Sequence, residues 1–173
     1  MASKNLVLRD AAESDADSIW QVHTASIKQL CSDHYSNEQI SDWIGRQRKE
    51  RYIQLIARDD DFVVVEDRDG QVIAFGHLGR CTDHGKYSPQ VNFEVFGFYV
   101  SPVVKRRGVG RRLMAELERR AMAQGCTRLG VCSTLNATPF YEACGFVVHK
   151  NSHCHCLGGV ELECKVLEKS ISH

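Results

Sequence analysis

The stretch SPVVKRRGVGRRLMAEL, residues 101–117, decides the fold because it sets two glycines among four arginines and a lysine. An apolar run at 90–100 precedes it, and apolar residues recur every four positions from Val109 to Ala121. This order predicts a buried strand, a glycine turn and an amphipathic helix. The first N–H groups of a helix have no partner within it, and glycine leaves such backbone open to a ligand. We therefore expect an anion-binding turn, the alternative being the solvated basic start of a helix.

Three phosphate-bearing ligands compete for such a turn. A P-loop requires GxxxxGK[ST], and the chain contains no Gly-Lys-Ser/Thr. A dinucleotide fingerprint requires GxGxxG, but Leu113 stands at the third glycine position and the stretch lies in mid-chain, behind an expected antiparallel hairpin. The third ligand, the pyrophosphate of coenzyme A, meets neither objection.

The composition indicates one globular domain, residues 1–173, without a charge bias. Hydrophobic residues make up 43% and charged residues 25%, and the formal net charge is +0. This balance argues against nucleic acid or a membrane surface as a partner. Residues 1–15 lack the apolar core of a signal peptide, and no stretch approaches membrane-spanning length. We therefore read the 8 cysteines as reduced thiols of a cytoplasmic protein.

The run HCHC, residues 153–156, is the closest approach to a metal cluster in the sequence. Strand alternation would place the two histidines on one face and the two cysteines on the other. Structural zinc sites use other spacings. We expect a packed strand here and no bound metal.

Elsewhere the hydrophobic pattern predicts a mixed α/β (α+β) fold. Two N-terminal helices are expected, followed by a hairpin at 61–79 that turns at Gly70. The helices should begin with capping boxes at Ser14–Asp17 and Ser36–Gln39. The other expected elements are strands at 5–10, 90–100, 128–134, 145–150 and 158–168, the helix from Val109 and a short helix at 136–144.

The glycine turn resembles the Gln/Arg-x-x-Gly-x-Gly/Ala motif of the GNAT acetyltransferase superfamily. Here Lys105 stands in the first place and Gly108 and Gly110 in the last two. Lysine keeps the charge of arginine but lacks its planar fork. The lead-in YVSP and the downstream LNATPFYEACGF, residues 135–146, are also similar to family elements. The resemblance implies a mixed, mostly antiparallel central sheet flanked by helices, with splayed fourth and fifth strands.

The resemblance also implies acetyl-CoA as cosubstrate, with its pantetheine arm between the splayed strands. Main-chain groups of Phe98, Tyr99 and Val100 would contact this arm, and Asn136 would contact the coenzyme from the far side. The backbone around the turn would wrap the pyrophosphate, the residues being Lys105, Arg106, Arg107, Gly108, Val109, Gly110 and Arg111.

The reaction needs a group that takes a proton from the amine and one that protonates the departing thiolate. Glu94 is the candidate base, because it lies within an apolar strand and its spacing from Gly108 is similar to that of the catalytic glutamate of histone-type members. The alternative is a structural carboxylate, with His77 in reserve. Tyr141 matches the family tyrosine beside the coenzyme sulfur and is the candidate acid. An acetyl-cysteine on Cys132 or Cys144 is not expected.

The function implied is acetyl-CoA-dependent N-acetylation of a primary amine, of a small molecule or amino acid. The alternatives are a protein lysine or N-terminal acetyltransferase, or a non-catalytic CoA-binding module. Aromatic side chains of the N-terminal helices and closing strands would hold the amine, with nearby carboxylates pairing with it. These are Trp20, His23, His34, Tyr35, Trp43 and the histidines of 149–155, with Asp33, Asp42 and Asp83. The closing strand offers an edge for a homodimer.

Overall fold

The computed structural model describes residues 6–58, 60–83, 85–104, 107–156 and 160–171, and the side chains of 154–156 are outside this description. A seven-stranded sheet runs in the order β1-β2-β3-β4-β5-β7-β6. Every pairing is antiparallel except that of β4 with β5. The strands are β1 (Val7–Asp10), β2 (Asp61–Glu66), β3 (Val72–Arg80), β4 (Phe93–Val100), β5 (Arg128–Thr134), β6 (Val147–Cys156) and β7 (Val160–Ser170). The expected mixed, mostly antiparallel sheet is confirmed.

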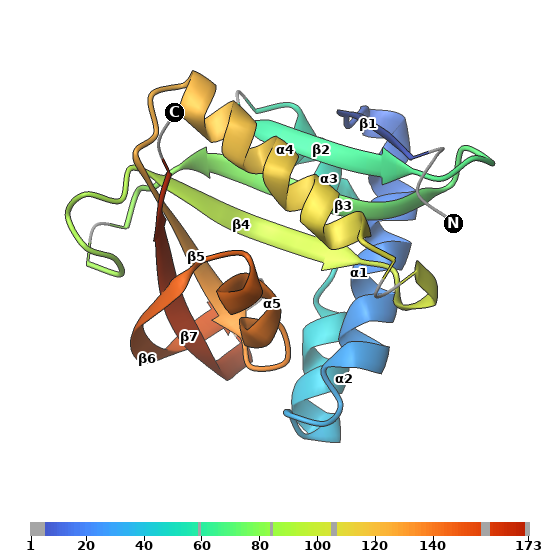
Figure 1. Cartoon of the computed structure of the whole chain (residues 1–173). Coiled ribbons are helices and arrows are strands. Elements are labelled where there is room, and N and C mark those ends of the chain that lie inside the picture. The colour runs from blue at the N-terminus through green and yellow to red at the C-terminus, as the bar shows by residue number, and fades with distance from the viewer. Residues whose placement is uncertain (1–5, 59, 84, 105–106, 157–159, 172–173) are drawn as a thin grey trace.

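Helices cover both faces of the sheet (Figure 1). On one face lie α1 (Ala16–Leu30), α2 (Asn37–Gly45) and α3 (Lys49–Ile56), and on the other lie α4 (Val109–Ala123) and α5 (Thr138–Ala143). Leu113 and Leu117 of α4 are fully buried in the core on their face. The core on the opposite face joins Ile19 of α1 to Phe75 of β3. No helix in the described ranges is both long and apolar enough to cross a membrane.

Only one of the two capping boxes expected at the N-terminal helices forms. The Ser36–Gln39 box is confirmed, since Gln39 N–H donates to Ser36 Oγ (3.1 Å) and Ser36 N–H donates to Gln39 Oε1 (2.9 Å). The box expected at Ser14 is wrong. A 3-10 turn, Glu13–Asp15, precedes α1, and Asp15 is the N-cap. Its carboxylate accepts from the Ala12 N–H and from a guanidinium of β1.

The third helix, α3, was not predicted. Its buried side chains are Tyr52 and Leu55, which stand three positions apart in an eight-residue helix. So short a pattern does not distinguish a helix from a loop. The α3 helix packs against α1. Arg51 of this helix and Arg58, just after it, line a cavity on the same face of the sheet.

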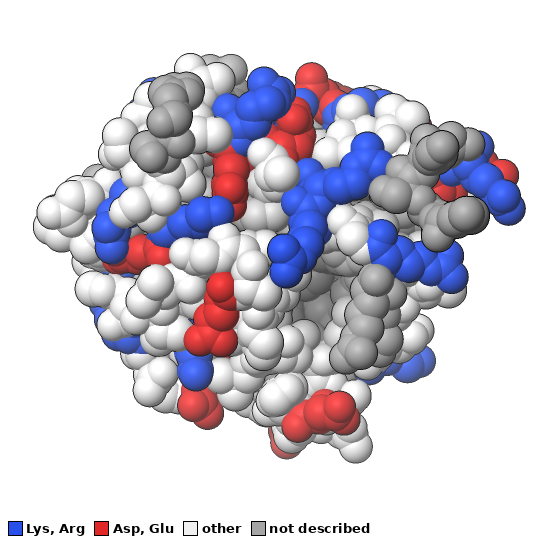
Figure 2. Space-filling view, in the orientation of Figure 1, with Lys and Arg blue, Asp and Glu red and all other residues white. Residues whose placement is uncertain are grey.

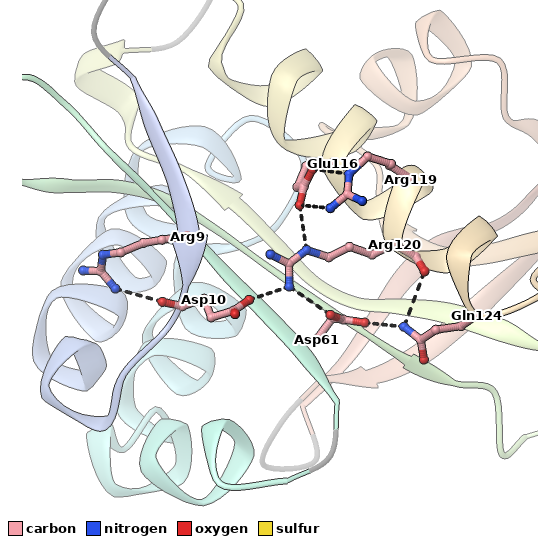
Figure 3. A network of polar contacts seen from close by, with 7 residues as sticks. All are labelled: Arg9, Asp10, Asp61, Glu116, Arg119, Arg120 and Gln124. Atoms are coloured by element: carbon pink, nitrogen blue, oxygen red, sulfur yellow. Dashed lines mark hydrogen bonds and ion pairs between the residues drawn. The ribbon is translucent and has the colours of Figure 1, made fainter.

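A network of charged side chains fixes α4 to the first two strands (Figure 3). Arg120 donates to Asp61 of β2 (2.9 Å), to Asp10 of β1 and to Glu116 one turn earlier (2.8 Å). Arg119 adds two hydrogen bonds to Glu116, at 2.8 and 2.9 Å. The hydrogen bonds from Arg119 and then Arg120 lower the pKa of Glu116 from 4.5 to about 2.

This shift predicts an acid-sensitive contribution to stability. A carboxyl group whose pKa is lowered by folding stabilises the protein above its unfolded pKa, and the contribution is lost as the pH falls towards the folded pKa. Replacing Glu116 with Gln should therefore lower the free energy of unfolding by about 1 kcal/mol at pH 7. Urea titrations should show this difference shrinking between pH about 4.5 and pH about 2. The exposed Glu142→Gln is the control, and an equal Glu116→Gln effect at pH 7 and pH 3 would contradict the assignment.

Candidate functional site

The fourth and fifth strands separate part-way along their length. β4 pairs with β5 only over Phe93–Val95, opposite Leu129–Val131. On its other edge the register with β3 skips Phe96, which is left out of the ladder. A bulge of this kind bends a strand, and beyond it β4 diverges from β5 (Figure 1). The splay implied by the resemblance is confirmed.

A small cavity of about 50 Å³ lies in this splay, between β4, β5 and α5. Tyr141 of α5 forms part of its wall. The Tyr141 ring packs edge-on against Phe98, Phe140 and Phe146, with centroids 5.4–6.0 Å apart. Burial raises the pKa of the Tyr141 phenol above its usual value of 10. At neutral pH the hydroxyl is therefore protonated and able to donate.

A larger cavity of about 450 Å³ continues from the splay to the first turn of α4. The two cavities share walls at Phe98, Tyr99, Thr134 and Ala137. Eight residues of the implied coenzyme site line the larger one: Phe98, Tyr99, Val100, Gly108, Val109, Gly110, Arg111 and Asn136. We call it the donor cavity. Arg107 is exposed beside it, whereas Lys105 and Arg106 lie outside the described residues.

The glycine turn gives the donor cavity a wall of bare backbone. Gly108 is the N-cap of α4 and has φ 78°, in the left-handed region that favours glycine. The first intrahelical bond runs from Arg112 N–H to Gly108 C=O (3.1 Å), so the N–H groups of residues 109–111 have no partner within the helix. A Cβ on Gly110 would lie 3.1 Å from Phe140 and 3.6 Å from Val100, both of which line the cavity.

Asn136 provides a polar atom that fits a ligand in the donor cavity. Its side-chain oxygen is buried and has no hydrogen-bond partner among the described residues. A buried amide oxygen without a partner is costly, and a ligand N–H or O–H would satisfy it. Together with the N–H groups of residues 109–111, which have no partner within the helix, it makes the cavity suitable for a ligand with both amide and phosphate groups.

The surface beside the donor cavity is basic. Figure 2 shows Lys and Arg side chains gathered over α4 and around a hollow beside its N-terminal end. Arg107, Arg111 and Arg112 are exposed there. Because the net charge of the chain is +0, this positive charge is a local feature. It suits an anion at the helix start.

Glu94 is buried as expected, but its carboxylate is already engaged. One oxygen, Oε1, accepts from the Lys86 ammonium group and from the Tyr87 hydroxyl (2.7 Å). Both partners belong to the β3–β4 loop, which folds back over this strand. Glu94 is not among the described residues that line the donor cavity, the cavity in the splay or a third cavity on the α1 and α3 face of the sheet.

A third cavity, of about 580 Å³, lies on the α1 and α3 face of the sheet. We call it the acceptor-side cavity. It shares Phe96, Gly97 and Tyr99 with the splay cavity, and Tyr99 lines all three cavities. His77 of β3 is in its wall, with Nε2 3.0 Å from Asp60 Oδ2. Burial lowers the pKa of His77, so its imidazole is neutral at pH 7.

Among the described members of the expected acceptor set, His23 alone lines this cavity. Trp43 and Tyr35 are buried in a separate core cluster, where the Tyr35 hydroxyl donates to the Glu163 carbonyl (2.7 Å). The remaining described members line none of the three cavities: Trp20, Asp33, His34, Asp42, Asp83, His149 and His153. The side chain of His155 is outside the described residues.

The sequence pattern did not point to Arg51 and Arg58, which line the acceptor-side cavity. Both belong to α3 or the turn after it, the segment with the weakest pattern. Their seven-residue spacing, two helical turns, was the available signal.

The cysteine patterns add no metal site within the described residues, where no group of three or more metal-binding side chains converges. HCHC does fall in a strand, β6, at one edge of the sheet. The side chains of Cys154 and Cys156 lie outside the description. Cys132 lines the splay cavity, with Sγ 3.1 Å from Cys164 Sγ.

Known proteins resemble this chain over most of its length. It is 23% identical over 154 residues to the uncharacterized N-acetyltransferase YafP of Escherichia coli, a match that covers 89% of each chain. A GCN5-related N-acetyltransferase structure from Rhodopseudomonas palustris matches 99% of this chain and 98% of its own, with a TM-score of 0.81 and 24% identity. The PaiA N-acetyltransferase of Thermoplasma acidophilum, in complex with coenzyme A, matches 97% of this chain and 100% of its own, with a TM-score of 0.78 and 21% identity.

The sequence pattern that defines the acetyltransferase (GNAT) family matches residues 26–146, which run from α1 through the splay and the glycine turn to α5. With this match, the chain belongs to the GNAT acetyltransferase family.

Proposed function

We propose that this chain, as one domain of residues 1–173, transfers an acetyl group from acetyl-CoA directly to the primary amine of a small molecule or amino acid. The observation that carries the proposal is that three cavities adjoin one another around the splayed end of β4. Tyr99 lines all three, so the donor and acceptor-side cavities meet at this strand. Coenzyme A in the PaiA relative supports the donor assignment.

In the donor cavity, the residues that would hold the coenzyme are those named from the sequence. The free N–H groups of residues 109–111, with Gly108 and the nearby arginines, would bind the diphosphate. Asn136 and the main chain of Phe98 and Tyr99 would bind the pantetheine arm. The Val100 carbonyl already accepts from Ser26 Oγ (2.9 Å), so its N–H is the freer contact. Acetyl-CoA supplies the thioester.

Each proton has an assigned group. A lysine-type amine has a pKa near 10.4 and must lose a proton before it attacks. As it bonds to the acetyl carbon and the carbon–sulfur bond breaks, the Tyr141 hydroxyl would donate a proton to the sulfur. His77 is the base that the geometry favours. In the tautomer whose Nε2–H donates to Asp60, its Nδ1 carries a free lone pair in a neutral ring.

Glu94, by contrast, would hold the β3–β4 loop through Lys86 and Tyr87. We expect Glu94→Gln to lower the melting temperature, because it leaves Lys86 without its buried partner, and to change kcat less than about threefold. His77→Gln should lower kcat/KM at pH 7 by roughly ten- to a hundredfold, with recovery near pH 10 as the free amine accumulates. Melting curves and pH–rate profiles separate the two roles. A hundredfold loss of kcat in Glu94→Gln at unchanged stability would restore Glu94 as the base.

The proposed function is tested by incubating the full chain with acetyl-CoA and a panel of primary amines while thiol release is followed. We expect release that depends on the amine. Coenzyme binding without release in the presence of any amine would instead favour a non-catalytic CoA-binding module.

A further inference from the structure

Three arginines line the acceptor-side cavity: Arg51, Arg58 and Arg80, of which Arg80 lies over the Phe93 ring, 5.0 Å from its centroid. Arg51 lies in α3 and Arg58 in the turn that follows it, and both line the cavity. Among the described residues, neither guanidinium makes an ion pair or a side-chain hydrogen bond. Burial lowers the pKa of Arg51, and the positive charge of Arg58 lowers it further. Both residues are exposed where they line the cavity, and an anion bound between them would offset the repulsion of their like charges.

The carboxylates in the same wall are already used by the protein. Asp60 is hydrogen bonded to His77 Nε2 (3.0 Å). Asp61 accepts from Arg120 (2.9 Å) and from Gln124, in the network that holds α4 (Figure 3). Among the described residues of this wall, the charged groups without an ion pair are therefore arginines.

His23 also lines the cavity, and its ring includes a buried nitrogen for which the described residues offer no hydrogen-bond partner. His23 is 3% exposed, and its Nδ1 lies 2.7 Å from the Tyr52 hydroxyl. Its Nε2 has no hydrogen-bond partner in the part of the chain that the structure describes. Burial lowers the pKa of His23 to about 3, with a smaller effect from the charge of Arg51, so the ring is neutral. The ring has two neutral tautomers. If Nδ1 accepts the hydrogen bond from the Tyr52 hydroxyl, Nε2 carries the ring hydrogen and can donate; if Nδ1 carries the hydrogen, Nε2 can accept.

The position of His23 places its ring close to the splay, where the acetyl transfer is proposed to occur. Its ring lies on that of Tyr99, with centroids 3.8 Å apart, and Tyr99 lines the splay cavity. A primary amine has both hydrogens and a lone pair, so it can satisfy Nε2 in either tautomer. An amine bound at His23 would thus lie beside the splay, with the arginines along the same cavity.

We propose that the acceptor is a small amine that carries an anionic group, such as an amino acid or an aminoalkylphosphonate. Its amine binds at His23 beside the splay, and its carboxylate or phosphonate binds Arg51 and Arg58. The cavity volume of about 580 Å³ lies in the usual range for small-molecule sites. This inference rests on the proposed function, because it treats the cavity as the acceptor site.

The test compares amines that differ only in the anionic group. The pairs are L-phenylalanine with phenethylamine, L-leucine with isopentylamine, and 2-aminoethylphosphonate with ethanolamine. For at least one pair we expect kcat/KM to favour the anionic member by about tenfold or more. The double variant Arg51→Met, Arg58→Met should abolish that preference by raising KM for the anionic amine, while the uncharged amine keeps its rate. Arg68→Met, an exposed arginine in the β2–β3 turn, is the control and should preserve the preference.

The outcomes separate this inference from the proposed function. The inference is overturned if kcat/KM for the uncharged amines equals or exceeds that for their anionic partners and the double variant does not change this. The transferase activity itself would then still be supported. If no amine is acetylated, the proposed function fails, and calorimetric titration of the same anionic amines decides the inference. Binding that is lost in the double variant supports an anionic-amine site, and an absence of binding overturns it.

Discussion

Replacing Tyr141 with phenylalanine is expected to lower kcat by about 100- to 1000-fold while leaving the affinity for coenzyme A unchanged. The change removes the hydroxyl that we assign to protonating the sulfur. It keeps the ring, whose contacts with Phe98, Phe140 and Phe146 hold α5 against the splay. Since burial raises the pKa of this phenol, its proton is retained until the thiolate forms. Single-turnover acetylation and coenzyme titration measure the two quantities separately.

Tyr35→Phe is the matched control for this experiment. Its hydroxyl is also largely buried, but it donates to the Glu163 carbonyl and accepts from the Leu135 N–H, away from the splay cavity. Losing these bonds should lower the free energy of unfolding by about 1–3 kcal/mol and change kcat little. If Tyr141→Phe acetylates amines as fast as the parent, Tyr141 is not the acid.

Replacing Gly110 with valine is expected to weaken coenzyme A binding by about a hundredfold or more. A Cβ at this position already meets Phe140 at 3.1 Å, and the two methyl groups of valine extend into the donor cavity or displace that ring. The helix itself should tolerate the change, because valine has a better helix propensity than glycine. Gly110→Ala should give a smaller loss. Isothermal titration with coenzyme A checks the series.

Ala115→Val provides the control, because this exposed residue lies on the same helix and outside the donor cavity. The melting temperature of the ligand-free Gly110→Val variant shows whether the domain remains folded. Saturating coenzyme at about a hundred times its dissociation constant should stabilise the parent by about 2.7 kcal/mol, and this increment should shrink in the variant. A folded Gly110→Val protein with parental affinity would contradict the donor cavity assignment.

Local sequence signals predicted most of the fold and suggested the residues proposed for the donor cavity. The alternation around Gly70, the capping box at Ser36 and the four-residue period of α4 each act within a few neighbouring residues. The residues proposed to bind coenzyme A were named from the family resemblance, which rests on contiguous motifs, the glycine turn and the element at 135–146. The sequence does not show that the side-chain oxygen of Asn136 is buried without a hydrogen-bond partner among the described residues; the structure does.

The proposed acceptor side depends on contacts between distant segments, and His23 is the one described member of the expected set that lines its cavity. Arg51 and Arg58 line a cavity with His23 and His77 because α3 packs against α1, beside a strand that comes later in the chain. For Glu94 the sequence left two roles open, a base and a structural carboxylate, and the return of the β3–β4 loop brings Lys86 to it. Burial, which sequence does predict for such residues, does not reveal which partner satisfies them.

The position at which coenzyme A binds is the most direct test of the donor site. Titrating it into ¹⁵N-labelled protein should shift the backbone amide signals of Gly108, Gly110 and Arg111 and the side-chain amide of Asn136 more than those of α3. Largest shifts around α3, with the first turn of α4 unchanged, would contradict the claim that the donor lies at the glycine turn.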